Sequence, residues 1–189
     1  MNRGYFQKFQ IKDVVFLAIM SAVALATCAV MPLVISLQPL IFGISQLVTA
    51  LQIGVFFAIG LYKVRKPGSL LIMALMMGLI QLMMSPPMFL SSVLNGILIE
   101  LIVLLLFRGY EKDAAVFVAA MLHTPLSLPF NYFYNRLVKG ADSPLAAGAD
   151  RAPLATVGMT LAGVAVSALG ALIGIKIARE LKKSGVLKK

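Results

Sequence analysis

The chain has 189 residues, of which 60% are hydrophobic and only 13% are charged. Soluble domains carry about a quarter charged residues, so this composition excludes an ordinary soluble protein and predicts an integral membrane protein. The net charge of +10 indicates topology first, because Lys and Arg accumulate beside cytoplasmic helix ends, and no nucleic-acid partner is expected. The only cysteine is Cys28, which excludes an intrachain disulfide and a multi-cysteine metal site.

Apolar stretches separated by charged or helix-breaking residues predict an all-α polytopic protein, because a membrane-spanning helix needs roughly 20 apolar residues. The segment 139–153, "KGADSPLAAGADRAP", is expected to be the only long loop. The chain is therefore interpreted as a single domain, residues 1–189, with six transmembrane helices. Their expected ranges are residues 13–35, 40–62, 68–85, 88–107, 113–138 and 153–176.

The first span follows a basic head, as a signal peptide would. Its apolar stretch is too long for a signal peptide, however, and the chain stays apolar after Cys28, which predicts a retained transmembrane helix. Within this helix Ala18, Ala22 and Ala26 recur every four residues. Such a small-residue face lets another membrane helix approach closely.

The second and third spans carry three isolated glutamines, Gln46, Gln52 and Gln81, which are weaker candidates for a pocket than for hydrogen bonds between helices. Methionines cluster at 73–77 and 83–88. Met side chains adapt to irregular spaces, but packing or lipid contact is the more common role of such a cluster.

The fourth span contains Asn95 and Glu100 in an otherwise apolar run. A carboxylate inside a membrane is costly and is usually found at a functional site. Glu100 is therefore predicted either to contact a ligand or to pair with another polar side chain of the protein. Gly96 lies one turn before Glu100 and would allow a close approach of the backbone there.

The fifth span reads "HTPLSLPFNYFYNR" from His123 to Arg136. Proline inside a spanning helix leaves backbone carbonyls without their usual donors, which is tolerated where protein or a cavity satisfies them. The span therefore favours a polar cavity near its outer half, with a simple interfacial tyrosine belt as the alternative. The candidate lining residues are His123, Asn131, Tyr132 and Tyr134.

The distribution of Lys and Arg predicts that both termini are cytoplasmic. With this orientation only Arg136, Lys139 and Arg151 lie outside, and the other fourteen of the seventeen basic residues lie inside. The predicted location is a prokaryotic plasma membrane, which the chain crosses several times.

Motifs for energy coupling or catalysis are missing from the sequence. There is no GxxxxGK[ST] loop for ATP, no HExxH zinc motif and no GxSxG nucleophile, and His123 is the only histidine. No catalytic residue, metal ligand or cofactor is therefore expected, and paired repeats of the kind found in secondary transporters are not evident.

Six spans, the Ala18-Ala22-Ala26 face, the "RKPGS" turn at 65–69 and the acid within "NGILIELIVLLLFRGYEK" together resemble the substrate-binding S components of energy-coupling factor (ECF) transporters, most closely the thiamine or hydroxymethylpyrimidine group. The resemblance implies partners: a transmembrane coupling subunit that docks on the alanine face, and two ATPase subunits. It also implies that a vitamin binds from outside. The implied substrate-binding residues are Asn95, Glu100, His123, Asn131, Tyr132 and Tyr134.

One departure from that resemblance is the lack of tryptophan, on which thiamine binders commonly stack their ligand, so an aromatic residue such as Tyr132 would have to serve. Two alternatives stay open. Haem could bind through His123 and the methionines, with Arg136, Lys139 and Arg151 near its propionates. The chain could instead be a structural scaffold of the cell envelope.

Overall fold

The computed structural model describes residues 8–28, 33–34, 36–140 and 142–187, and every regular element in this part of the chain is a helix. The elements are α1 (Ile11–Thr27), α3 (Ile44–Val64), α4 (Ser69–Leu82), α5 (Pro86–Phe107), α6 (Asp113–Val138), α7 (Pro144–Arg151) and α8 (Pro153–Lys183). The prediction of an all-α protein is confirmed for these residues.

Local sequence explains most helix ends. Gly43 and Gly68 precede α3 and α4 with φ of 89° and 91°, a left-handed conformation that glycine adopts without steric cost. A proline opens α5, α7 and α8 at the first helical position, where its fixed φ suits the helix and its missing N–H is not needed.

Several expected boundaries differ from those in the structure, and three differences are informative. The first helix ends at Thr27 although its expected range runs to residue 35, because hydropathy alone does not mark a helix end; residues 29–32 and 35 of that range lie outside the described part of the chain. The expected loop at 139–153 contains α7, which Ser143 caps by accepting a hydrogen bond from the Ala146 amide. The last helix continues to Lys183, since a basic sequence can leave the apolar membrane core and remain helical.

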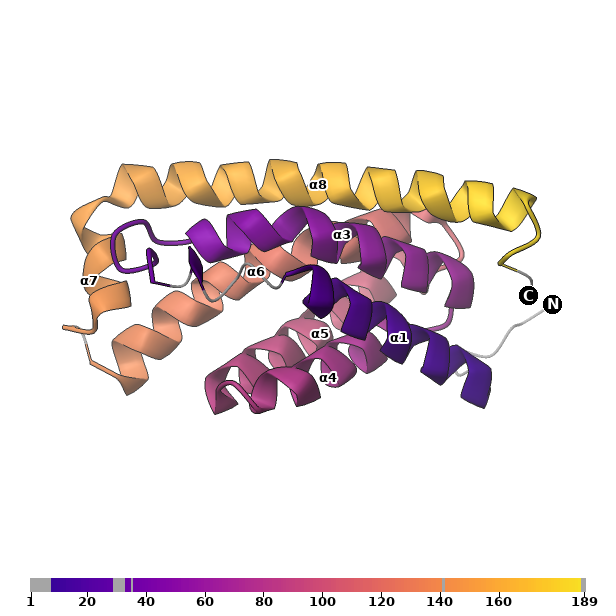
Figure 1. Ribbon diagram of the computed structural model, residues 1–189, viewed down its shortest axis with the longest axis horizontal. Coiled ribbons are helices and arrows are strands. Elements are labelled where there is room, and N and C mark those ends of the chain that lie inside the picture. The colour runs from indigo at the N-terminus through magenta and orange to yellow at the C-terminus, as the bar shows by residue number, and fades with distance from the viewer. Residues whose placement is uncertain (1–7, 29–32, 35, 141, 188–189) are drawn as a thin grey trace.

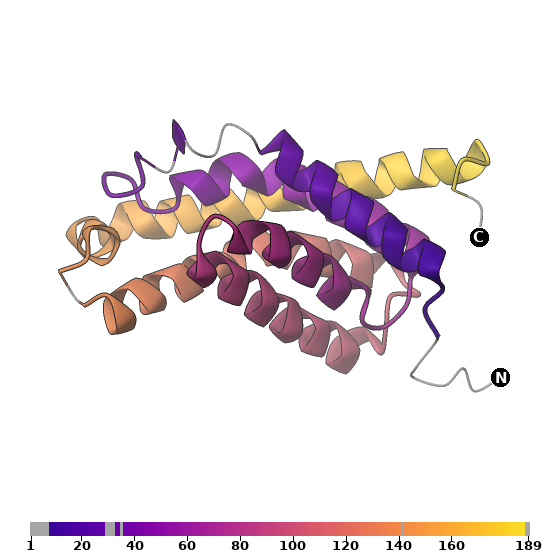
Figure 2. The same ribbon diagram turned by 60° about the horizontal axis from the view of Figure 1, so that its bottom comes forward.

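Pairwise packing places α1, α3, α6, α5 and α4 in a ring, in that order, and α8 lies outside it against α3 and α6. Figures 1 and 2 show the long α8 running beside α3, with α4 and α5 paired on the opposite side of the molecule. Phe57, Leu61, Met73 and Val103 are fully buried within this ring. The short α7 packs on α6 and α8 at the end far from both termini.

Close approach of α3 and α8 depends on glycine. A Cβ at Gly170 would collide with the Leu51 carbonyl oxygen, and one at Gly174 with the Val55 carbonyl oxygen. These glycines are four residues apart on α8, the spacing of a small-xxx-small membrane interface. Gly54 of α3 faces the same contact, where a Cβ would lie 2.9 Å from the Ser167 carbonyl oxygen.

In the described part of the chain four helices, α3, α5, α6 and α8, have the length and apolar composition needed to cross a bilayer, and α4 is apolar but has only 14 residues. At 1.5 Å per residue, α4 is roughly 21 Å long, shorter than a typical hydrocarbon core of about 30 Å. Four of the six expected spans are thus supported by length and composition.

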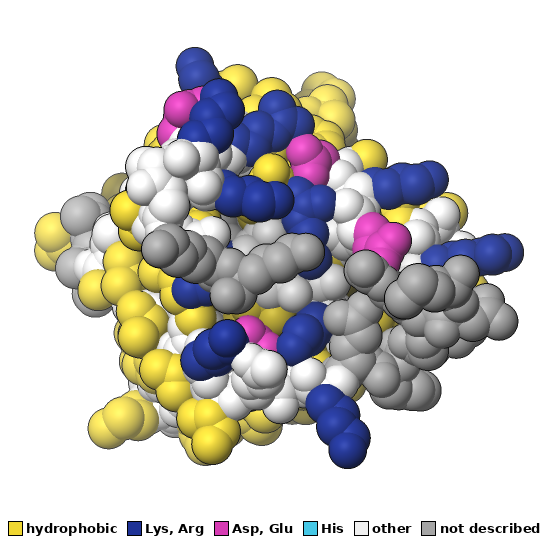
Figure 3. Space-filling view, turned by 90° about the vertical axis from the view of Figure 1, so that its right-hand side faces the viewer, with side chains coloured by type: hydrophobic (Ala, Val, Ile, Leu, Met, Phe, Trp, Pro, Cys, Tyr) yellow, Lys and Arg dark blue, Asp and Glu magenta, His cyan; other side chains and the backbone are white. Residues whose placement is uncertain are grey.

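Charged residues concentrate at the end of the molecule that holds both termini (Figure 3). Asp113 at the start of α6 forms ion pairs with Arg65, in the turn before α4, and with Arg179 of α8. Lys66 pairs with Asp13 of α1 at 2.7 Å. These pairs connect α1, the α3–α4 turn, α6 and α8 at one end of the bundle.

Candidate functional site: a polar cavity

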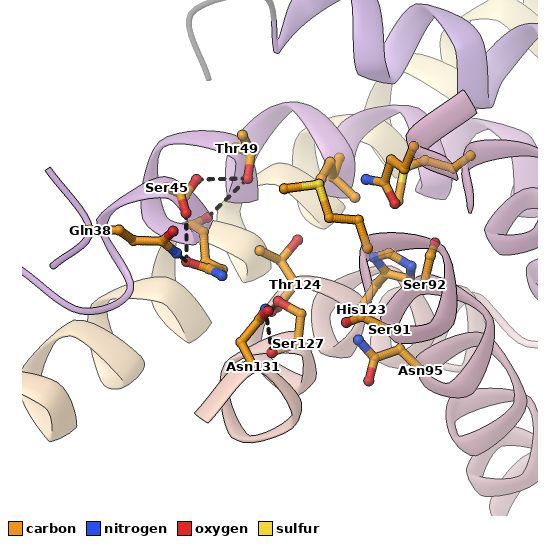
Figure 4. A pocket seen from close by; sticks show the side chains of 15 residues that line it. Gln38, Ser45, Thr49, Ser91, Ser92, Asn95, His123, Thr124, Ser127 and Asn131 are labelled. Carbon is orange, nitrogen blue, oxygen red and sulfur yellow. Dashed lines mark hydrogen bonds between the residues drawn. The ribbon is translucent and has the colours of Figure 1, made fainter. Parts of the chain in front are cut away.

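A cavity of about 100 Å³ opens between α3, α4, α5 and α6, in the half of the bundle away from the termini. Its described lining combines amides, hydroxyls and one imidazole with three apolar side chains. The lining residues are Gln38, Ser45, Gln46, Thr49, Ile53, Met77, Gln81, Met88, Ser91, Ser92, Asn95, His123, Thr124, Ser127 and Asn131. Figure 4 shows how the polar groups of α3, α5 and α6 gather around it.

The middle of α6 carries His123 and Thr124 into this cavity, and α8 supports it from behind. Pro125 has no N–H to donate to the carbonyl of Met121, one turn earlier. Ser167 of α8 donates its hydroxyl proton to that carbonyl instead, at 2.8 Å. Pro125 is therefore tolerated within a continuous helix, and the expectation that protein groups would satisfy the freed backbone holds for the Met121 carbonyl.

Part of the lining is held in place by hydrogen bonds within the wall. The Gln46 Oε1 atom accepts from Gln38 Nε2 at 3.0 Å and from Ser45 Oγ at 2.8 Å. Ser92 of α5 donates to the Ala74 carbonyl of α4 at 3.0 Å, and Asn131 donates to the Ser127 carbonyl at 2.9 Å. These groups are oriented before any ligand arrives.

Another part of the lining has polar atoms without a hydrogen-bond partner among the described residues. They are Asn95 Nδ2, both ring nitrogens of His123 and Thr124 Oγ1, and each of the three residues is only 4% exposed. The His123 ring lies 4.5 Å from the Phe57 ring, centroid to centroid, which fixes its position by packing. Buried polar groups are nearly always hydrogen-bonded, so these atoms are suited to receive polar groups of a ligand or water.

Three of the six predicted substrate-binding residues, Asn95, His123 and Asn131, line the cavity. Gln46 and Gln81, which were weaker candidates, line it as well. The structure therefore brings together polar residues from the expected second, third, fourth and fifth spans.

Glu100 is not among the described lining residues, and its carboxyl group is occupied near the end of the bundle that holds the termini. Its Oε1 atom accepts from the Gly68 amide at 2.6 Å and its Oε2 atom from the Tyr110 hydroxyl at 2.9 Å. The first-turn amides of α4 at Leu70 and Leu71 also interact with it. An acid at a helix N-terminus is stabilised by the helix dipole, so the structure favours the structural role for Glu100.

The tyrosine of the Glu100 contact lies in the turn between α5 and α6. Burial, and then the neighbouring Glu100 carboxyl, raise the pKa of Tyr110 well above its usual value. The phenol therefore stays protonated at physiological pH and can donate its hydrogen bond to Glu100 throughout that range.

Tyr132 and Tyr134 also lie outside the described lining. The Tyr132 hydroxyl donates to Asp150 of α7 at 2.8 Å and accepts from Arg136 at 2.6 Å, and Arg136 pairs with Asp150 at 2.6 Å. The Tyr134 ring packs against Phe130. Tyr132 thus connects α6 to α7, which the sequence did not reveal because α7 was expected to be a loop.

The polar lining residues that the sequence did not indicate are Gln38 and the serines and threonines. Serine and threonine in membrane helices often bond to their own backbone, as Thr49 does with the Ser45 carbonyl at 2.9 Å. Their presence therefore gives no sign of a cavity. The only available signal was their density near the starts of α3 and α5 and in the middle of α6.

The alanine face of α1 points away from the bundle. Leu17, Ser21 and Ala24 are buried against the neighbouring helices, whereas Ala22 and Ala26 are exposed and Ala18 is half-buried.

Among the described residues no group of three or more His, Cys, Asp and Glu side chains could hold a metal ion.

A search of solved structures finds a similar fold in a structure described as "Crystal structure of an S-component of ECF transporter". The TM-score is 0.66, with 21% sequence identity over 95% of this chain and 89% of that chain. No curated protein sequence matches the chain.

The sequence itself matches the model of a family described as "Hypothetical bacterial integral membrane protein (Trep_Strep)" over residues 11–183. That match runs from the first residue of α1 to the last residue of α8, and it agrees with the apolar composition of the helices. The chain therefore belongs to this Trep_Strep family of bacterial integral membrane proteins.

Proposed function

We propose that the chain is the substrate-binding S component of an ECF-type importer, which captures a vitamin or vitamin precursor in the polar cavity. The observation that carries the proposal is the cavity itself, in which Asn95, His123 and Thr124 present unpartnered polar atoms inside an apolar bundle. Its fold is shared with a solved S component. The expected ligands from the sequence resemblance are thiamine or hydroxymethylpyrimidine.

The charged end of the bundle indicates how the protein would be oriented in the membrane. Basic residues beside helix ends are retained on the cytoplasmic side, so the end with the termini and with Arg65 and Arg179 would face the cytoplasm. The cavity, in the opposite half, would then receive its ligand from outside, beneath α7. In this arrangement the cell membrane holds the chain with both termini inside.

Transport itself would need partners. The exposed Ala22 and Ala26 of α1 provide a smooth surface on which a transmembrane coupling subunit could pack closely. Two ATPase subunits bound to that coupling subunit would supply the energy. The chain would contribute specificity and passage of the ligand, and no catalysis of its own.

A haem ligand fits the cavity less well than a small polar molecule does. His123, Met77 and Met88 line the cavity, but Arg136 is held by Asp150 and Tyr132, away from the lining. The volume of about 100 Å³ is also below the roughly 300–1,000 Å³ typical of pockets for drug-sized ligands, which favours a compact ligand.

The direct test is to identify what the protein binds. Protein purified gently from its own membranes should release one small molecule in near-stoichiometric amount, detected by mass spectrometry. The variant Asn95→Leu, which replaces an unpartnered amide of the lining, should release much less, while Asn131→Leu should have a smaller effect because its amide already bonds to Ser127. Protein that carries no small molecule and co-purifies with cell-envelope enzymes would favour the scaffold alternative.

A further inference from the structure

The charge of the cavity lining limits the chemistry of the ligand. The fifteen described lining residues include no Asp, Glu, Lys or Arg. A charged ligand that enters an apolar membrane protein needs a counter-charge or several charge-assisted hydrogen bonds, because it loses the solvation of water. Among the described residues the lining offers no permanent counter-charge, since its only titratable side chain is the imidazole of His123.

Two acidic residues on helices near the cavity, Glu100 of α5 and Asp150 of α7, already have partners in the fold. Glu100 accepts from the Gly68 amide and the Tyr110 hydroxyl, and Asp150 pairs with Arg136. Neither residue lines the cavity. Recruiting one of them would break a contact that holds α4 or α7 in place.

The unpartnered atoms define a pattern of donors and acceptors. Asn95 Nδ2 provides N–H donors, a neutral His123 provides one donor and one acceptor, and the Thr124 hydroxyl provides either. A matching ligand presents both acceptors and donors on one compact frame. Ile53, Met77 and Met88 supply apolar contact for the rest of its surface.

We infer that the ligand is an uncharged, compact organic molecule with hydrogen-bond donors and acceptors, and that the cavity discriminates against cations and anions of similar shape. The inference rests on the proposed function and narrows it. Of the two ligands expected from the sequence, it favours hydroxymethylpyrimidine over the thiazolium cation thiamine.

Matched probe pairs test this inference on the purified full-length protein at neutral pH. Two pairs share a frame and differ in charge, nicotinamide with nicotinate and pantothenol with pantothenate. Hydroxymethylpyrimidine and thiamine share only the pyrimidine, because thiamine adds a cationic thiazolium ring, and they are compared as the two ligands expected from the sequence. Titration calorimetry measures the affinity of each probe, and mass spectrometry identifies the molecule released from the protein as purified. In any pair that binds, the neutral member should bind at least tenfold more tightly, and the released molecule should be uncharged.

A variant ties the binding to the cavity. Thr124→Val keeps the side-chain shape and removes the hydroxyl, so the neutral probe should bind several-fold more weakly. Thr160→Val is the matched control, because the Thr160 hydroxyl of α8 donates to the Thr156 carbonyl at 2.8 Å and is not among the described lining residues. The Thr160→Val protein should bind the neutral probe as tightly as the wild-type protein does.

The outcomes separate this inference from the proposed function. Tighter binding of a charged member, or a charged released molecule, with affinity reduced by Thr124→Val would overturn the inference and leave a substrate-binding subunit in place. Binding that Thr124→Val leaves unchanged would show that the ligand occupies another site and would also overturn it. Protein that releases no molecule and binds no probe would overturn the proposed function, and the inference with it.

Discussion

At the scale of single residues, polar groups in this membrane protein divide into two kinds. Some complete the fold: Ser167 donates to the carbonyl that Pro125 leaves free, and Glu100 binds the start of α4 and Tyr110. Others, such as Asn95 and His123, have unpartnered atoms facing the cavity. A polar residue within these apolar helices is thus not by itself a sign of a binding site.

The first prediction concerns Glu100. Replacement by alanine leaves the Gly68 amide and the Tyr110 hydroxyl without their acceptor, which should cost about 1–3 kcal/mol of stability. Thermal unfolding in detergent should show a lower melting temperature for the Glu100→Ala protein, and a smaller decrease for the Tyr110→Phe protein. Ligand affinity of the folded Glu100→Ala protein should stay within about twofold of wild type, less than 0.5 kcal/mol; a tenfold loss of affinity would show that Glu100 contacts the ligand.

The candidate site could be predicted from sequence only in part, for a reason visible in these residues. Asn95 and His123 are conspicuous in apolar spans, and both line the cavity. Glu100 is more conspicuous still, but its Oε1 atom accepts a hydrogen bond from the Gly68 amide. Gly68 is distant in sequence, so no local pattern reveals this contact. Ser91 and Thr124 line the cavity yet look like ordinary membrane serine and threonine.

At the scale of helices, the sequence predicts the boundaries well where charged or helix-breaking residues flank an apolar stretch on both sides. The expected helix at 113–138 is confirmed at both ends, and the one at 88–107 begins two residues earlier, at Pro86. The end of α1 at Thr27 could not be predicted because the apolar stretch runs past it. The sequence does mark the start of α7, because Ser143 is a favourable N-cap and Pro144 a favourable first helical residue. The helix is short and polar, however, so a hydropathy pattern does not distinguish it from a loop.

The second prediction concerns the contact of α3 with α8. Gly170→Ala places a methyl group against the Leu51 carbonyl, so the helices must separate, and the melting temperature in detergent should fall. Gly163→Ala is the matched control on the same helix, because a Cβ there meets nothing within 4 Å. It should leave stability unchanged or raise it by up to about 1 kcal/mol through helix propensity.

Equal melting temperatures for the two glycine variants would contradict this account of the helix contact. A lower melting temperature of the Gly163→Ala protein alone would contradict it as well, because that position has open space for the added methyl group.

The third prediction concerns the exposed face of α1. Ala22→Trp places a large side chain where a coupling subunit would pack closely, so co-purification of the two proteins should be lost. Ligand affinity of the isolated variant should be unchanged, since Ala22 points away from the bundle. Leu105→Trp, at an exposed position on another helix, α5, is a control for added size. A complex that forms normally with Ala22→Trp would argue against this docking face.

At the scale of the whole molecule, one end is charged and tied together by ion pairs, whereas the other half holds the cavity. Asp113 with Arg65 and Arg179, and Lys66 with Asp13, join four parts of the chain at the first end. This division suits a protein that meets lipid headgroups and partner subunits at one membrane surface and its ligand at the other.

The fourth prediction concerns orientation in the membrane. In a Cys28→Ser background, a membrane-impermeant thiol reagent should label Asp142→Cys, between α6 and α7, on intact cells. It should label Ser184→Cys, at the end of α8, only after the cells are permeabilised. The reverse pattern would place the cavity half toward the cytoplasm and would contradict import from outside.

The most direct test of the central claim is uptake of the identified ligand by liposomes that contain the purified chain. The chain has no ATP-binding P-loop, so alone it should bind the ligand without concentrating it, even with a proton or sodium gradient imposed. Addition of the transmembrane coupling protein and two ATPase subunits should give accumulation that requires ATP hydrolysis. Concentrative uptake by the chain alone, driven by an ion gradient and abolished when the gradient collapses, would contradict the account.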